Sequence, residues 1–224
     1  MKGCGRKIGP YDCCTIVTGD ARELAKAIPD ESVDLIFTDP PYSKEYLYLY
    51  AALFEIGARV LTPDGFLLTY AGGYWKDEVM AMARTHLDYF WDHFIVDGAD
   101  SVIIWPRKII TRGKSILAYR RRGSNGLPVC NTLGLWQGGG KDKRYHHWGQ
   151  DENTARYYIG CFSSKGQAVL DPFCGGGTTL YACKKMGVHY LGFEIDPKVA
   201  RQAGERVMNT QASLAQPEQA AMDL

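Results

Sequence analysis

Short apolar segments alternate with longer amphipathic ones along most of the 224-residue chain. The short segments are rich in β-branched and aromatic residues and end at polar residues or glycines, which is typical of buried strands. The predicted strands are 15–19, 33–38, 66–71, 92–96, 101–105, 115–119, 167–171 and 189–194. The predicted helices are 21–28, 45–61, 74–87, 151–162, 177–186 and 197–209. This alternation predicts an α/β fold, with helices flanking a mixed, mostly parallel sheet.

Single residues support the predicted helix boundaries, and one glycine-rich stretch interrupts the alternation of strands and helices. Asp20 and Asp151 can each cap the helix that follows, and Pro197 suits the first turn of the last helix. Residues 121–147 contain six glycines and no clear periodicity, so this stretch is either functional or disordered. We find no internal repeat.

Composition narrows the class of protein. A hydrophobic fraction of 46% suits one sizeable domain with its own core. The seven cysteines form no CxxC pair and no cleavable signal pattern is seen, so we expect a cytoplasmic protein. No apolar run approaches the length of a membrane span.

Zinc is the metal that the cysteines and histidines would suit best. Cys4, Cys13 and Cys14, together with His146 and His147, have the right chemistry for zinc. They lack the paired ligands at short spacing that structural zinc sites usually show, so the sequence predicts no metal site.

The net charge of +1 hides an uneven distribution. No acidic residue lies between Asp100 and Asp142, whereas eight basic residues do: Arg107, Lys108, Arg112, Lys114, Arg120, Arg121, Arg122 and Lys141. Removing these eight from the 26 basic residues leaves 18, against 25 acidic ones. An acidic body with one basic stretch indicates a polyanionic partner, the alternative being a plain solvated face.

The sequence DPPY, residues 39–42, follows the predicted strand 33–38. In an open α/β sheet, ligands bind beyond the carboxyl ends of the strands, where this loop lies. Pro40 and Pro41 stiffen it and remove backbone donors, so its carbonyl groups remain available to a ligand. Tyr42 adds a flat ring against which a planar group can stack. The alternative is a plain rigid turn.

A planar ligand with an NH2 group fits these parts. Its two hydrogens can go to the Asp39 carboxylate and the Pro40 carbonyl. An aromatic amine is a poor nucleophile because its lone pair is delocalised, and holding both hydrogens out of the ring plane localises the pair toward an electrophile.

A second motif, AVLDPFCGGGTT, spans residues 168–179. Its glycines, 175–177, let the backbone approach a ligand closely, as nucleotide-binding strand–loop–helix units require. It is not a Walker loop, and Leu180 replaces the third glycine of the dinucleotide fingerprint. Glu194 ends the next predicted strand, where related nucleotide folds place an acid that binds ribose hydroxyls.

As a pair in this order, the two motifs resemble the S-adenosylmethionine-dependent amino-methyltransferases of DNA, specifically their β-class arrangement, over roughly residues 15–210. The resemblance implies a Rossmann-like class I methyltransferase fold, circularly permuted so that the catalytic half comes first. We therefore expect one domain over residues 1–224. Its expected parts are a catalytic half (15–120), a target-recognition insertion (121–147), a cofactor-binding half (148–210) and a flexible tail (211–224).

The resemblance also implies roles for individual residues. Asp39, Pro40, Pro41 and Tyr42 would be catalytic. The implied contacts of the cofactor, S-adenosyl-L-methionine, are Asp20, Ala21, Asp39, Asp171, Pro172, Phe173, Cys174, Gly175, Gly177, Thr178, Thr179, Glu194 and Ile195. Asp20 as a helix cap alone is an open alternative. The Lys-Pro pair common before the cofactor strand is absent, which leaves Trp148, Gln150 and Asn153 as candidate contacts.

The implied partner is double-stranded DNA. Its expected contacts are the basic residues Arg107, Lys108, Arg112, Lys114, Arg120, Arg121, Arg122, Lys141, Lys143 and Arg144. Phosphate contacts position a protein without reading sequence, so residues 123–147 are expected to read the bases. Homodimers are common in the resembled class, and no membrane is expected.

The expected reaction is direct methyl transfer to adenine N6, with the base flipped out of the duplex. DPPY favours adenine, and cytosine N4 is the near alternative. Two rivals stay open: a catalytically silent DNA-binding or partner-binding module of the same fold, and methylation of RNA or of a protein amide.

Overall fold

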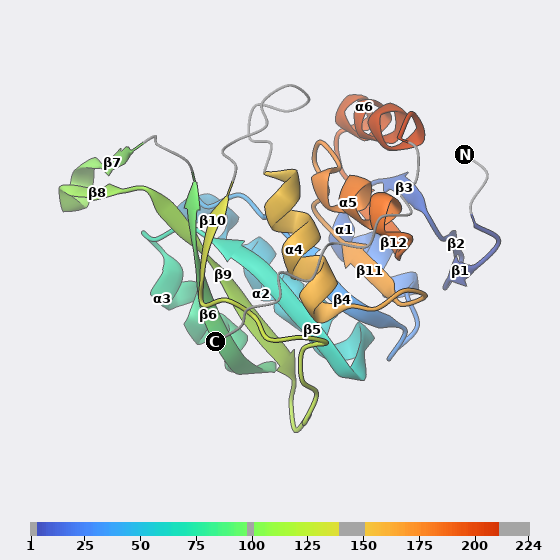
Figure 1. The fold of residues 1–224 in the computed structure, drawn as a ribbon, viewed down its shortest axis with the longest axis horizontal. Coiled ribbons are helices and arrows are strands. Elements are labelled where there is room, and N and C mark those ends of the chain that lie inside the picture. The colour runs from blue at the N-terminus through green and yellow to red at the C-terminus, as the bar shows by residue number, and fades with distance from the viewer. Residues whose placement is uncertain (1–3, 98–100, 139–150, 211–224) are drawn as a thin grey trace.

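Most of the chain is built around one large sheet (Figure 1). The computed structural model describes residues 4–97, 101–138 and 151–210. In these ranges the large sheet has eight strands in the order β10-β6-β9-β5-β4-β11-β12-β3. Their bounds are β3 Thr15–Thr18, β4 Val33–Thr38, β5 Leu61–Ala71, β6 Leu87–Asp97, β9 Gly113–Arg121, β10 Leu135–Gly138, β11 Ala168–Asp171 and β12 His189–Glu194. Only β9 runs antiparallel to its neighbours, so the expected mixed, mostly parallel sheet is confirmed.

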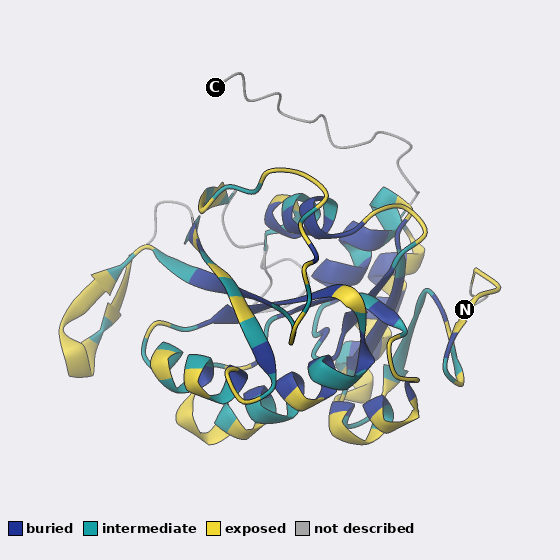
Figure 2. Ribbon diagram, turned by 90° about the horizontal axis from the view of Figure 1, so that it is seen from below, coloured by how far each residue is buried: buried dark blue, intermediate teal, exposed yellow. Residues whose placement is uncertain are grey.

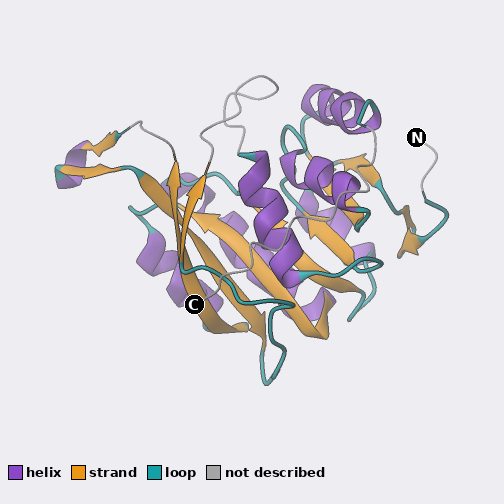
Figure 3. Cartoon of the chain, viewed as in Figure 1, coloured by secondary structure: helices purple, strands orange, loops and turns teal. Residues whose placement is uncertain are grey.

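Helices cover both faces of this sheet (Figure 3). Their bounds are α1 Ala21–Leu24, η1 Ala25–Ala27, η2 Lys44–Tyr46, α2 Leu47–Val60, α3 Lys76–Ala83, α4 Glu152–Phe162, α5 Thr178–Met186 and α6 Pro197–Met208. One core lies beneath α1, α2 and α3, and a second lies beneath α4 and α5 and includes Val207 of α6. Parallel strands are covered on both faces, and accordingly β4, β11 and β12 are almost entirely buried and mostly apolar.

Two small two-stranded ribbons lie outside the large sheet. β1 (Lys7–Ile8) pairs with β2 (Tyr11–Asp12) near the N-terminus. β7 (Val102–Ile104) pairs with β8 (Ile109–Thr111) across the short helix η3 (Trp105–Arg107). The β7–β8 ribbon projects from the end of the molecule away from β1 and β2, and most of it is exposed (Figures 1 and 2). Within the described residues, no helix has both the length and the apolar character needed to cross a membrane.

The apolar pattern located most elements but misplaced some boundaries. Strands 33–38 and 189–194 are confirmed to the residue. The helix predicted at 74–87 is wrong after Ala83, because α3 ends there and β6 begins at Leu87. The strand predicted at 101–105 is shorter and belongs to the β7–β8 ribbon. The four-residue strand β10 and the two-residue strands β1 and β2 were missed, since such short segments carry no readable period.

Candidate active site

Four neighbouring parallel strands end at the same edge of the sheet, called here the carboxyl edge. In order across the sheet they are β4, β11, β12 and β3, and the residues that end or follow them include Asp39, Asp171, Glu194 and Asp20. After β4 the chain crosses one face of the sheet through α2, whereas after β11 it crosses the other face through α5. The reversal between β4 and β11 is the switch point at which open α/β sheets bind ligands.

The loop after β4 holds Asp39 and Tyr42 in direct contact. The Tyr42 hydroxyl donates a hydrogen bond to Oδ1 of Asp39. Burial, followed by the charge of Asp39, raises the pKa of Tyr42 well above its usual value, so the hydroxyl stays protonated and remains a donor. Tyr42 therefore orients the carboxylate and also competes for it with any other donor.

Gly72, directly after β5, packs against the Tyr42 ring. A Cβ added at Gly72 would lie 3.0 Å from Tyr42 Cβ and 3.1 Å from Tyr42 Cγ, whereas one added at Gly73 would meet nothing within 4 Å. Because Gly72 has no side chain, the Tyr42 ring can pack against its backbone. Sequence reasoning missed Gly72, although a glycine pair right after a strand that ends beside residues 39–42 is a readable signal.

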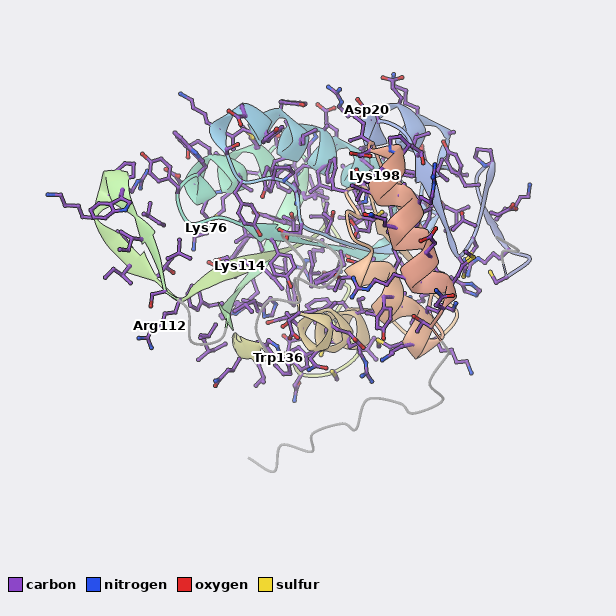
Figure 4. All side chains as sticks on the ribbon, turned by 90° about the horizontal axis from the view of Figure 1, so that it is seen from above. Asp20, Lys76, Arg112, Lys114, Trp136 and Lys198 are labelled. Atoms are coloured by element: carbon purple, nitrogen blue, oxygen red, sulfur yellow. The ribbon has the colours of Figure 1, made fainter. Side chains whose placement is uncertain are left out.

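A second layer of aromatic and basic side chains surrounds the loop of residues 39–42. The Tyr50 hydroxyl donates to the Tyr70 carbonyl at 2.9 Å. The Lys114 ammonium lies over the Tyr70 ring, 4.5 Å from its centroid, and 6.0 Å from the centroid of the Tyr42 ring. Lys76 donates to Asp92 at 3.0 Å and to Ser115 at 3.2 Å. Figure 4 shows Lys76 and Lys114 close together near the middle of the molecule. Lys114 therefore lies beside the loop of residues 39–42, and Lys76, which sequence reasoning did not single out, binds its neighbour Ser115.

A buried hydrogen bond joins the two motifs. The Thr38 hydroxyl donates to Oδ1 of Asp171 at 2.7 Å, and the Phe173 backbone N–H donates to the same oxygen at 3.2 Å. Burial raises the pKa of Asp171 to about 6 against the lowering effect of these bonds, and the charge of Asp39 adds a smaller increase. Asp39 and Asp171 are thus close enough to repel each other, which makes their surroundings favourable for a cation.

The glycine loop and Glu194 are tied together through backbone donors. Gly175 N–H donates to Glu194 Oε2 at 3.0 Å, and Asp196 N–H donates to Oε1 at 2.9 Å. Gly175 and Gly177 have φ of +47° and +75°, which favour glycine. A Cβ at Gly175 would meet nothing within 4 Å, so a ligand has room to approach the backbone there. Each Glu194 oxygen also has a second lone pair for a hydroxyl donor.

The other predicted cofactor residues are either exposed at the edge of the site or buried as part of the structure that supports the glycine loop. Ile195 is exposed beyond Glu194. The four residues Pro172, Cys174, Thr178 and Thr179 are buried, which makes them part of the support of the loop. Cys174 N–H donates to Phe193 O at 2.9 Å, and burial raises the pKa of its thiol, which agrees with a packing role.

Asp20 lies at the rim of the site, and its carboxylate already has hydrogen-bond and ion-pair partners. Its side chain accepts from Arg22 N–H at 2.9 Å as the cap of α1, and it forms an ion pair with the Arg22 guanidinium. That pairing lowers the pKa of Asp20. Ala21, the next residue, is buried.

The structure divides the described part of the basic stretch between the two edges of the sheet. Lys114 is the second residue of β9, at the carboxyl edge. Because β9 is antiparallel, residues 120–122 lie at the opposite edge, roughly 20–26 Å away at about 3.3 Å per residue. Arg121 pairs there with Glu31 at 2.5 Å, and Arg122 donates to the Arg84 carbonyl at 2.5 Å. Arg120 donates to the Gly126 carbonyl at 3.4 Å. These three side chains therefore already have partners within the chain.

Arg107, Lys108 and Arg112 are exposed on or next to the projecting β7–β8 ribbon. The Arg107 guanidinium lies 4.4 Å from the centroid of the Tyr74 ring, which connects the ribbon to the loop that follows β5. Asn153 is exposed in the first turn of α4, where Asp151 caps the helix as predicted. The remaining candidates lie outside the described residues: Lys141, Lys143, Arg144, His146, His147, Trp148 and Gln150.

The chain is similar to known DNA methyltransferases in sequence and in fold. Residues 119–205 match the family described as DNA methylase, N6_N4_Mtase. The type II methyltransferase M.HpaI of Haemophilus parainfluenzae is 23% identical over 86% of this chain and 73% of its own length. The solved structure of the PvuII DNA methyltransferase, described as cytosine-N4-specific, has a TM-score of 0.74 at 17% identity, over 88% of this chain and 87% of that one. M1.HpyAVI, solved as a SAM complex, has a TM-score of 0.70 at 21% identity, over 88% of this chain and 99% of that one.

These findings establish the class I methyltransferase fold for the chain. Together with the family match over residues 119–205 and the curated relatives, they support a DNA methyltransferase of the N6/N4 family.

Proposed function

We propose that this chain transfers a methyl group from S-adenosyl-L-methionine to the N6 amino group of an adenine that has been flipped out of duplex DNA. The observation that carries the proposal is the position of Asp39 and Asp171 at the carboxyl ends of two adjacent strands, β4 and β11, with Thr38 hydrogen-bonded to Asp171. An acceptor for an amine and a loop suited to a cofactor therefore share one side of the sheet.

The proposed role of residues 39–42 is to hold and activate the amine. Asp39 and the Pro40 carbonyl each accept one amino hydrogen, which turns the nitrogen lone pair toward the methyl donor. Tyr42 competes for Asp39, so the incoming amine takes the place of the Tyr42 hydroxyl while the ring remains available for stacking. The gain comes from orientation and fixed dipoles, since the amine needs no prior deprotonation.

The residues present fit S-adenosyl-L-methionine, which supplies an electrophilic methyl group on a sulfonium. Its positive charges suit the surroundings of Asp39 and Asp171, where the two carboxyls repel each other. Gly175 leaves room for close approach, and Glu194 has lone pairs for the two ribose hydroxyls. Exposed Ile195 and half-buried Phe173 offer apolar surface for the adenine ring and the methionine chain. Asp20, engaged by Arg22, is assigned only to the rim of the adenine site.

For DNA, we assign phosphate contacts to the basic residues at the carboxyl edge and on the ribbon: Arg107, Lys108, Arg112 and Lys114. Arg120, Arg121 and Arg122 are left out, because they lie at the other edge with partners inside the chain. Duplex binding should weaken steeply as salt rises, since phosphate contacts release counterions.

Cytosine N4 is the second candidate for the methylated position. It is favoured by the similarity in fold to the PvuII enzyme, which is described as cytosine-N4-specific. Adenine is preferred here because of aspartate in the first position of DPPY, which the resembled family associates with adenine.

The test is methyl transfer from labelled cofactor to duplex DNA, followed by nucleoside digestion and mass spectrometry. N6-methyladenine is the expected product, and N4-methylcytosine alone would contradict the adenine assignment. Asp39→Ala should abolish transfer while cofactor binding persists. Cofactor or DNA binding without any transfer would instead support a silent module. Competition with RNA and with peptide substrates should leave duplex DNA as the preferred acceptor.

A further inference from the structure

Four side chains with metal-binding atoms meet at a place remote from the carboxyl edge. They are Cys4, Cys13, Cys14 and His189, and their sulfur and nitrogen atoms all lie within 4.8 Å of one another. His189 Nδ1 is 3.2 Å from the sulfur of Cys4 and 3.2 Å from that of Cys13. The sulfurs of Cys13 and Cys14 are 3.4 Å apart.

We propose that these four residues bind one zinc ion in a structural Cys3His site. Zinc in such sites is tetrahedral, with bonds of about 2.3 Å to sulfur and about 2.0 Å to nitrogen. Ligand atoms on such a tetrahedron are separated by roughly 3.5–3.8 Å, given those bond lengths. The three short separations in the cluster, 3.2–3.4 Å, are a few tenths of an ångström below this range, and all the ligand atoms lie within 4.8 Å of one another, so small side-chain movements would complete the coordination. All four cysteine and histidine donors are of the types that zinc prefers.

The backbone brings the two adjacent cysteines to one side. In an extended chain, successive side chains point in opposite directions. Cys14 has φ of +63°, in the left-handed region that non-glycine residues seldom adopt. This turn lets the Cys13 and Cys14 sulfurs approach each other. Such a conformation is strained for a residue other than glycine and persists where the surroundings hold it in place.

Backbone hydrogen bonds fix the rest of the geometry. Cys13 N–H donates to Arg6 O at 2.8 Å, which closes the β1–β2 turn between Cys4 and Cys13. Cys14 N–H donates to Tyr190 O at 2.6 Å, next to His189 at the start of β12. Cysteines far from His189 in sequence are therefore held against it by the fold.

The site would be structural, not catalytic. His189 begins β12 and Glu194 ends it, so the cluster lies at the opposite end of this strand from the carboxyl edge. Figure 1 shows β1 and β2 at the end of the molecule near β3 and β12. β1 and β2 have only two residues each, too few to be stable as an isolated ribbon. Bound zinc would tie residues 4–14 to the edge of the large sheet and add its binding free energy to folding.

The proposed site shares its three cysteines with the zinc arrangement that we considered from the sequence and rejected, and it differs from that arrangement in its histidine. His146 and His147 lie outside the described residues, and His189 supplies the histidine instead. Nothing in the spacing of the chain indicates His189, because it is separated from Cys13 by most of the sequence.

The experiment starts with full-length protein purified without added metal or chelator. Elemental analysis should find about one equivalent of zinc per chain. After exchange to Co²⁺, the visible spectrum should show tetrahedral d–d bands and a thiolate-to-cobalt charge-transfer band. Cys4→Ser and His189→Ala should weaken Co²⁺ binding by roughly a hundredfold or more, since ligand loss should cost at least as much as loss of a supporting residue.

Cys130→Ser is the matched control, because Cys130 is exposed and outside the cluster, so its zinc content and cobalt spectrum should equal those of wild type. Cofactor binding, measured in every variant, establishes that each one is folded. A wild-type protein with neither zinc nor cobalt–thiolate bands would overturn the proposal. A Cys13–Cys14 disulfide would also overturn it, and mass spectrometry of protein kept free of reductant would detect that disulfide as the loss of two hydrogens. Cobalt bands that persist in His189→Ala would overturn it as well.

Discussion

At the carboxyl edge of the sheet, Asp39 and Asp171 lie close enough that one carboxyl raises the pKa of the other. At the opposite edge, charges of opposite sign meet instead: Arg121 with Glu31 at 2.5 Å, and Arg122 with Asp88 at 3.9 Å. The same strands support both edges. Opposite charges at the surface add a little stability, whereas like charges at a buried carboxyl cost stability and favour a cationic ligand. The contrast separates an edge suited to a cationic ligand from one held by surface ion pairs.

The largest effect is expected from Asp39→Asn. The carboxamide keeps the shape and one acceptor oxygen, but it loses the negative charge and replaces the other oxygen by an NH2 donor, so it holds the amino hydrogen more weakly. We expect kcat to fall by on the order of 10²–10³, with cofactor affinity by calorimetry little changed. Asp64→Asn, an exposed aspartate in β5, is the control and should keep full activity. Comparable activity in both variants would remove Asp39 from the reaction.

Asp171 should make stability depend on pH in the cofactor-free protein. Its pKa is about 6 in the fold and 3.8 as the unperturbed reference. Because the folded value is the higher one, the contribution is fully present below pH 4 and is lost as pH rises through about 6, a decrease of about 3 kcal/mol in unfolding free energy.

Asp171→Asn keeps an oxygen for Thr38 and Phe173 and carries no charge, so it should remove that decrease. Urea unfolding at several pH values between 4 and 8 measures the effect. The two proteins should converge near pH 4, and the variant should be the more stable one at pH 8. Parallel curves over the whole range would contradict the prediction.

Gly72 and Gly73 offer a matched pair beside the catalytic loop. Gly72→Ala places a methyl group about as close as 3.0 Å to Tyr42, whereas Gly73→Ala meets nothing within 4 Å. Displacing Tyr42 should lower kcat by roughly ten- to a hundredfold, and Gly73→Ala should leave it unchanged. Steady-state kinetics decide this, with thermal unfolding to verify that both variants fold. Equal kinetics would mean that Tyr42 tolerates movement.

The smallest effects should separate the two ends of β9. Lys114→Gln should reduce the slope of log K for DNA against log salt by about one, as expected for one phosphate contact. Arg121→Gln should leave that slope unchanged and cost at most about 1 kcal/mol of stability, because its surface ion pair is lost. Salt titrations of duplex binding measure both variants. A reduced slope in Arg121→Gln would mean that the opposite edge of the sheet also contacts DNA.

The sequence by itself determined the class of fold and the two motifs. Strands 33–38 and 189–194 and the caps at Asp20 and Asp151 could be read because they depend on local periodicity and on single residues next to a helix. The order of the motifs also pointed to a DNA methyltransferase, which the comparisons support.

Only the tertiary structure decided which residues meet. The pairing of β4 with β11 brings Thr38 to Asp171, the antiparallel direction of β9 separates Lys114 from Arg121, and the start of β12 brings His189 to Cys13. The physical reason is that strand order and direction are set by contacts between segments far apart in the chain. The local hydrophobic period does not carry that information. It therefore could not predict that Lys114 and Arg121 lie apart or that Cys13 and His189 lie together.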